Sequence, residues 1–183
     1  EDFTDRYTNI GVSGLNYRVF APDNLSLPPY RLNVHVYSCC LINNRMPYDW
    51  RLRYNEDTDL CLQVLTGGMC TVLFMTFVID KLQTMTVSGG NTDDLYQYDG
   101  RLTMARTLER QWPGVVETRR RYGRPQHVIK NGWKNFDTPL QRRDDIDWDN
   151  LPTPEPHYGL KLTQVDPNSA PTHSTVQRWL QEQ

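Results

Sequence analysis

Residues 70–79 place the strongest restriction on the fold of this chain. The run Cys-Thr-Val-Leu-Phe-Met-Thr-Phe-Val-Ile is almost continuously apolar and rich in β-branched side chains. Such a run predicts a strand buried on both faces of an α/β sheet, and it is far too short to span a bilayer. Residues 57–65, just before it, have the pattern of an amphipathic helix that stops at Gly67-Gly68. The sequence therefore predicts an α/β domain in which a helix leads directly into a central strand.

The start of this helix is strongly acidic, with Glu56, Asp57 and Asp59 following Asn55. Carboxylates in a first turn complement the exposed N–H groups and the helix dipole, and Asn55 suits the N-cap. A cap needs only one acid, however, and three neighbouring carboxylates repel one another unless a cation or a proton separates them. The cluster could also bind a hard divalent cation, orient a sugar hydroxyl or abstract its proton. From the residues alone, the structural and the functional interpretation stay equally open.

The first 42 residues divide into a loop region and a strand. Gly11, Gly14 and the prolines that follow them predict that residues 1–30 are largely loop. Residues 32–42 are rich in Val, Tyr and Leu and predict a β-strand. His35 alternates with valines in this run, so we expect it to have a structural role.

Residues 100–111 are predicted to form a helix with one apolar stripe, ended by Pro113-Gly114. The stripe consists of Leu102, Ala105 and Leu108. Beyond this helix, residues 115–116 and 127–129 predict two short strands around a basic turn.

Composition changes after residue 136. Six of the twelve prolines fall in the last forty-seven residues, together with mixed charge and few aliphatic side chains. We therefore expect a core-bearing domain over residues 1–136 and a Pro-rich extended tail over 137–183. A short terminal helical turn is expected around Val176, Trp179 and Leu180.

Charge and cysteine content restrict the class of protein. Twenty basic and twenty-two acidic residues give a net charge of −2, so no global basic field indicates nucleic acid. The chain opens with acidic and polar residues, which do not form a signal peptide. The four cysteines lack metal-ligand spacing, and we expect them to be reduced and partly buried. These observations favour a cytoplasmic protein without a membrane partner. The cysteines are Cys39, Cys40, Cys61 and Cys70.

His127 lies next to a cluster of arginines formed by Arg119, Arg120, Arg121 and Arg124. In a functional interpretation, the imidazole binds a metal ion and the guanidinium groups hold a diphosphate bidentately. The alternative is a solvated arginine face beside an ordinary histidine. No nucleophile elbow and no cysteine in an electropositive setting supports covalent hydrolysis.

Several stretches together resemble one enzyme family. The order of acidic helix, Gly-Gly stop and buried strand is similar to the second half of a GT-A glycosyltransferase, where an x-Glu-Asp motif opens the helix beneath the acceptor. The wider text resembles the TET-associated glycosyltransferases of phages and fungi over about residues 1–136. The matching stretches are residues 9–20, 37–65, 70–77, 85–92, 101–113 and 122–127. The resemblance implies a mixed sheet with flanking helices, and a host-cytoplasmic location if a bacteriophage encodes the chain.

The resemblance also implies roles for individual residues. Asp57 would be the general base for the acceptor hydroxyl if the enzyme inverts the configuration of the sugar, and Glu56 would bind the acceptor or shape the site. His127 would be a ligand of a divalent metal ion, Mn²⁺ or Mg²⁺. The donor would be a nucleotide sugar, and the acceptor a 5-hydroxymethylpyrimidine in DNA. The residues expected to bind substrate are Asp59, Trp50, Gly89, Gly90, Asn91, Thr92 and Arg124.

The family's Asp-x-Asp motif, which holds the metal and the diphosphate, belongs to the N-terminal nucleotide-binding half, ahead of residue 1 here. We therefore expect either that a second polypeptide supplies this half or that the chain is inactive. An inactive transferase-like module that binds nucleic acid or a protein partner is the main alternative. A metal-dependent nuclease built on the acidic cluster is a weaker one.

Overall fold

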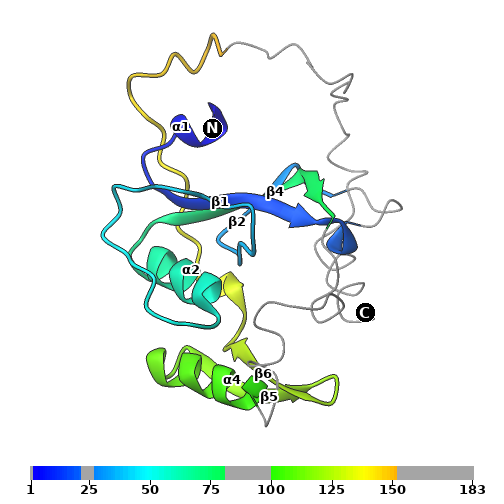
Figure 1. Cartoon of the computed structure of the whole chain (residues 1–183). Helices are drawn as coiled ribbons and strands as arrows, with labels where there is room; N and C mark the ends of the chain where they lie inside the picture. The colour runs from blue at the N-terminus through cyan, green and yellow to red at the C-terminus, as the bar shows by residue number, and fades with distance from the viewer. Residues whose placement is uncertain (1, 22–26, 81–99, 152–183) are drawn as a thin grey trace.

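The computed structural model describes residues 2–21, 27–80 and 100–151, which form an α/β structure (Figure 1). A mixed four-stranded sheet has the order β2-β4-β1-β3, and a separate two-stranded sheet consists of β5 and β6. The central strands β1 and β4 are parallel, whereas β2 and β3 are antiparallel to their neighbours. The strands are β1 Ile10–Tyr17, β2 Tyr30–Leu32, β3 Leu41–Ile42, β4 Cys70–Ile79, β5 Val116–Arg121 and β6 Arg124–Ile129. The helices are α1 Asp2–Asp5, α2 Glu56–Thr66 and α4 Gly100–Gln111, with short 3₁₀ turns at Arg18–Phe20 and Trp133–Asn135. Across these ranges, no helix has the length and apolarity that crossing a bilayer requires.

β1 is a central strand, so the prediction that residues 1–30 are largely loop was wrong. Its two glycines are needed for packing and do not break the strand. A Cβ on Gly11 would lie 2.7 Å from a methyl group of Val64, and a Cβ on Gly14 would lie 2.5 Å from one of Val36. Glycine in a strand interior can mark such a close approach, which a reading of glycine as a turn signal misses.

The prediction of one strand over residues 32–42 was also wrong. Only the ends of this segment are strands, β2 and β3, and residues 33–40 form an irregular connection. Asn33 and Cys39 both have positive φ angles, 54° and 52°, which interrupt an extended chain. Val36 lies between them with 1% exposure and anchors the connection to the core.

Helix α2 lies between two layers, with the four-stranded sheet on one side and α4 with the β5–β6 hairpin on the other (Figure 1). Toward the sheet it packs Leu60, Cys61 and Val64 against Val12 and Val36. Toward α4 and the hairpin, Leu62 packs against three further buried side chains, those of Leu108, Val116 and Ile129. Eight of its eleven residues are buried, so the helix is a core element and not a surface amphipathic helix.

The remaining predicted elements agree well with the structure. β4 and α4 have the predicted bounds, and Ala105 and Leu108 of the predicted stripe are buried. β4 is buried on both faces only over its first half, since Phe77 and Val78 are exposed. The two strands around the basic turn are longer than predicted and pair in continuous register from Val116↔Ile129 to Arg121↔Arg124.

Residues 137–143 return to the four-stranded sheet. The side chain of Asn9 donates to the carbonyl of Pro139 and accepts from the N–H of Gln141, both at 2.8 Å. Asn33 donates to the carbonyl of Thr138 at 2.8 Å. This first part of the predicted tail is therefore bound to the sheet through backbone groups, whereas the predicted terminal helical turn lies outside the described residues.

Candidate active site

The acidic start of α2 places its carboxylates in different surroundings. Asn55 occupies the N-cap position with φ 54°, but its side chain donates to the carbonyl of Met104 and makes no capping bond. Glu56 is exposed. Asp57 accepts the N–H of Thr58 at 2.7 Å and is partly exposed, whereas Asp59 is fully buried. The three carboxylates therefore point in different directions, as expected for positions one and two residues apart on a helix.

Asp59 is surrounded by hydrogen-bond donors of the protein itself. Arg51 binds both of its oxygens, at 3.0 and 2.5 Å. Gln63 donates at 2.9 Å and the indole N–H of Trp112 at 2.6 Å. Because a buried carboxylate needs such partners, this network stabilises the packing between the segment before α2, the helix itself and the end of α4. Its predicted role in substrate binding has no support from this geometry.

Asp57 instead faces two imidazoles. Its Oδ2 lies 3.2 Å from Nε2 of His35. The hydroxyl of Thr58 lies 3.1 Å from the same nitrogen and 3.5 Å from Nε2 of His127. Three separate segments therefore converge here: the irregular connection after β2, the start of α2, and strand β6. We call Asp57, Thr58, His35 and His127 the acid–imidazole cluster.

The cluster shifts the protonation of its members. Burial opposes the ionised form of Asp57, but the hydrogen bond and charge of His35, the N–H of Thr58 and the charge of His127 outweigh it and lower the pKa of Asp57. Burial, with a further contribution from His35, lowers the pKa of His127. At neutral pH the arrangement therefore combines an ionised carboxylate with a neutral imidazole, which is a proton acceptor and a potential ligand.

A cavity of about 520 Å³ opens beside the cluster. His35 and His127 line it, together with Trp133. Cationic side chains also line it, and these are Arg119, Arg121 and Lys134. The single carboxylate among the lining residues, that of Glu117, forms an ion pair with Arg119 at 2.6 Å. The cavity thus has a net positive wall next to a proton acceptor.

His35 is the residue of this site that the sequence did not reveal. Its ring stacks on Trp133, with centroids 5.6 Å apart and planes at 13°, and it contacts Tyr37 at 4.4 Å. The expectation of a structural role for His35 rested on a strand that does not form. No local pattern could have found it, because its approach to Asp57 depends on the irregular connection of residues 33–40.

The other predicted site residues lie apart from the acid–imidazole cluster or outside the residues that the structure describes. Trp50 is 53% exposed in the segment before α2. Arg124 is exposed near the end of the hairpin and does not line the cavity, whereas Arg119 and Arg121 do. The predicted acceptor loop, Gly89 to Thr92, lies outside the described residues.

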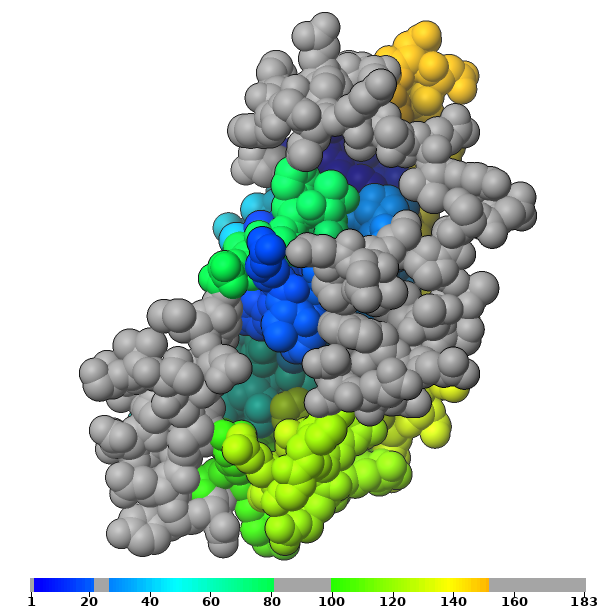
Figure 2. Space-filling model, turned by 90° about the vertical axis from the view of Figure 1, so that its right-hand side faces the viewer, coloured from blue at the N-terminus to red at the C-terminus, as the bar shows by residue number. Residues whose placement is uncertain are grey.

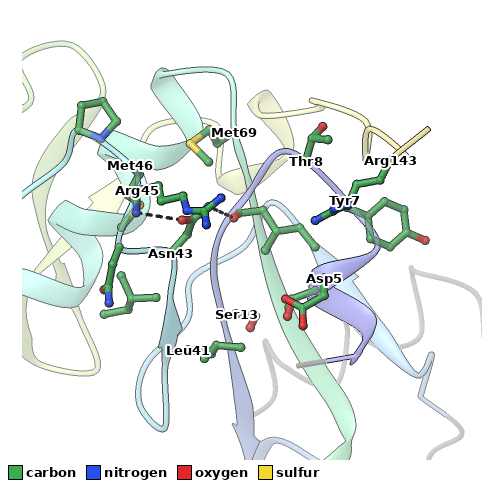
Figure 3. A pocket seen from close by; sticks show the side chains of 16 residues that line it. Asp5, Tyr7, Thr8, Ser13, Leu41, Asn43, Arg45, Met46, Met69 and Arg143 are labelled. Atoms are coloured by element: carbon green, nitrogen blue, oxygen red, sulfur yellow. Dashed lines mark hydrogen bonds between the residues drawn. The ribbon is translucent and has the colours of Figure 1, made fainter. Parts of the chain in front are cut away.

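A second, larger cavity of about 730 Å³ lies at the β3 edge of the sheet, between α1, β1 and β3 (Figure 3). Asp5 and Arg143 lie at one side of it, and Asn43 and Arg45 at the other. Among its described lining residues there is neither a histidine nor a cysteine, and Asp5 supplies the one carboxylate. Although it is larger, none of its lining residues belongs to the acid–imidazole cluster, whereas His35 and His127 line the first cavity, which we take as the candidate active site.

The described residues do not by themselves form a metal site. Among them, no three His, Cys, Asp or Glu side chains are arranged as the ligands of one ion. His35 and Asp57 are bound to each other, so His127 is the imidazole that could contribute a ligand to a metal held by further groups.

Comparison with known proteins bears on the first half of the chain. Residues 1–90 match the family model described as TET-Associated Glycosyltransferase. No curated protein and no solved structure matched the chain. The matched region contains His35 and Asp57, whereas α4 and the hairpin with His127 follow it.

Proposed function

We propose that this chain, whose residues 1–90 match the TET-associated glycosyltransferase family model, transfers a sugar from a nucleotide sugar to the hydroxyl of a 5-hydroxymethylpyrimidine in DNA. The observation that carries the proposal is the partly exposed carboxylate of Asp57, which lies 3.2 Å from His35, a residue that lines the cationic cavity. A transferase of this kind needs one group that takes the proton of the acceptor hydroxyl. Asp57 has the geometry and the charge for that role.

In the proposed step, the acceptor oxygen attacks the anomeric carbon while the bond from that carbon to the nucleotide diphosphate breaks. The diphosphate leaves with the electron pair, and the hydroxyl proton passes to a carboxylate oxygen of Asp57. The lowered pKa of Asp57 keeps it deprotonated at neutral pH, so the base is ready before the acceptor binds. His35 holds the carboxylate through Oδ2, which orients the other oxygen and limits its rotation.

The wall of the cavity supports a DNA acceptor. Guanidinium groups pair bidentately with phosphate oxygens, and such contacts position a nucleic acid without reading its sequence. Arg121 and Lys134 have no acidic partner among the described residues, so both are available to phosphates. The ring of Trp133, stacked on His35, adds an apolar surface of the kind that sugars and bases contact.

The proposal includes a divalent cation, with His127 as one ligand, and a second polypeptide that supplies an Asp-x-Asp segment. A bound cation would neutralise charge on the departing diphosphate. Because the described residues lack a complete ligand set, we derive no step through this ion.

The proposal is tested by product analysis. The protein, with its nucleotide-binding segment present, is incubated with a panel of nucleotide sugars and DNA that contains 5-hydroxymethylcytosine or 5-hydroxymethyluracil. Mass spectrometry of the digested nucleosides should show one added glycosyl group on the hydroxymethylated base and none on DNA with ordinary bases. Unmodified nucleosides with every donor would contradict the proposal, and strand cleavage would favour the nuclease.

A further inference from the structure

The β5–β6 hairpin carries an exposed aromatic ring at its tip, at a position where the backbone disfavours it. The two turn residues are Tyr122 and Gly123, with φ angles of 51° and 74°. This is a two-residue turn with both central residues left-handed, for which Asn-Gly is the preferred sequence. Tyr122 nevertheless occupies the first position and is 69% exposed. Tyr122 thus combines a strained backbone conformation with a solvent-exposed ring that adds little packing to the fold. This combination points to a contact outside the chain.

The hairpin is anchored at one end and free at the other. Val116 and Ile129, at its base, are buried in the core that they share with α2 and α4. Every residue from 119 to 124 is exposed. Figure 2 shows this hairpin in yellow-green on the surface at the lower end of the molecule. The hairpin is therefore a short arm whose base is packed in the core and whose tip faces solvent.

The free end carries an unusual concentration of positive charge. Arg119, Arg120, Arg121 and Arg124 lie within six residues. Arg119 pairs with Glu117, and Arg120 donates to the carbonyl of Gly123 across the turn. Arg121 and Arg124 lie directly opposite each other in the register, although like charges at such positions repel. Neither of the two has an acidic partner within the described parts of the chain, so both guanidinium groups are available to bind an external anion.

The arm is continuous with the candidate active site. Arg119 and Arg121 line the same cavity as His35 and His127, so the cationic wall leads from the cluster to the tip. Thr118 pairs with His127, and Tyr122 follows four residues further along the chain. At about 3.3 Å per residue, the tip is about 13 Å from the level of His127.

We propose that the β5–β6 hairpin is an arm that grips duplex DNA, and that Tyr122 at its tip is a wedge that stacks among the bases beside the acceptor nucleotide. A two-stranded ribbon fits the major groove, where its arginines reach the phosphates. Inserted apolar rings unstack a base step, and enzymes that modify a base must take it out of the stack. This inference rests on the proposed DNA acceptor but not on sugar transfer itself.

The wedge is tested with the full chain and a duplex that carries one 5-hydroxymethylpyrimidine next to 2-aminopurine, whose fluorescence rises when it is unstacked. At saturating protein, the unmodified chain should raise the fluorescence several-fold. Tyr122→Asn places a preferred residue in the turn, so it should fold normally and bind the duplex while losing the rise. Tyr122→Phe keeps the ring and should keep the rise.

A rise with Tyr122→Asn equal to that of the unmodified chain would overturn the wedge, as would binding without any rise. The grip is tested by the salt dependence of the Kd. Arg121→Gln should lower the slope of log Kd against log salt by about one, whereas Arg106→Gln, on the exposed face of α4, should leave it unchanged. Equal slopes for the two variants, or equal affinity for duplex RNA, would overturn the grip. None of these measurements needs a nucleotide sugar, so a failure of glycosyl transfer is seen separately.

Discussion

At the scale of single residues, Asp57 and Asp59 show how two carboxylates two positions apart on one helix come to lie in different surroundings. Four protein donors bind Asp59 inside the fold. Asp57 has the N–H and the hydroxyl of Thr58 and one imidazole as partners, and part of its surface stays open. The sequence shows two acids of the same kind, and only their surroundings separate the buried Asp59 from Asp57, the proposed base.

His35 should control the acid side of the pH profile. Its hydrogen bond and charge are the main factors that lower the pKa of Asp57. His35→Phe keeps the ring that stacks on Trp133 but removes both factors, so the pKa of Asp57 should rise. Because a general base acts only when deprotonated, the acid limb of kcat/KM should move to higher pH.

The same shift has a consequence for stability. A lowered folded pKa means that ionised Asp57 contributes stability above its unfolded pKa of about 3.9, and that this contribution is lost as the pH falls through the lowered value. In His35→Phe the folded pKa should move toward the unfolded value, so this contribution and its loss at acid pH should both become smaller. An acid limb and an acid-unfolding profile that coincide with those of the unmodified chain would show that His35 does not act on Asp57.

At the scale of elements, the sequence predicted what depends on local pattern. The apolar run of β4, the Gly-Gly stop of α2 and the Pro-Gly end of α4 are local signals, and each gives the correct element. β1 was missed because Gly11 and Gly14 are determined by the side chains that approach them from other elements. The proximity of His35 to Asp57 was not predicted for the same reason, since the position of His35 depends on the irregular connection and not on alternation along a strand.

Gly14→Ala should confirm why β1 contains glycine. The added Cβ would meet Val36 at 2.5 Å and the carbonyl of Ser38 at 3.1 Å. Overpacking of this kind costs about 1–3 kcal/mol in the free energy of unfolding. The control Arg106→Ala, at an exposed position on α4, should change it by less than about 0.5 kcal/mol. Urea denaturation of both variants measures the difference, and equal midpoints would refute the packing argument.

At the scale of the whole molecule, α2 joins the sheet to the α4 and hairpin layer. One side of the helix packs on the sheet. The other side packs on a second core, which Leu62 forms with buried side chains of α4 and the hairpin, so each layer needs α2 to bury its apolar side chains. The candidate active site also draws its residues from both parts of the molecule. Asp57 and His35 come from the region that matches the family, and His127 comes from the hairpin beyond it.

Leu62→Ala tests whether the two layers fold together. Leu62 of α2 is fully buried in the second core, and its truncation should lower the free energy of unfolding by about 2–5 kcal/mol. Because α2 belongs to both cores, near-ultraviolet circular dichroism and tryptophan fluorescence should give one shared, lower denaturation midpoint. Leu41→Ala, at an exposed position of β3, is the control. Two separate transitions in the Leu62 variant would mean that the layers unfold independently.

The most direct measurement of the central claim is single-turnover sugar transfer by Asp57→Asn, with the proposed Asp-x-Asp polypeptide added. The rate on hydroxymethylated DNA should fall by about 10²–10⁴-fold, because the amide cannot accept the hydroxyl proton. The thermal unfolding midpoint should stay close to that of the unmodified protein, and Asp137→Asn, at an exposed position, should leave the rate unchanged. A folded Asp57→Asn variant that transfers sugar at the unmodified rate would contradict the role of Asp57 as the base.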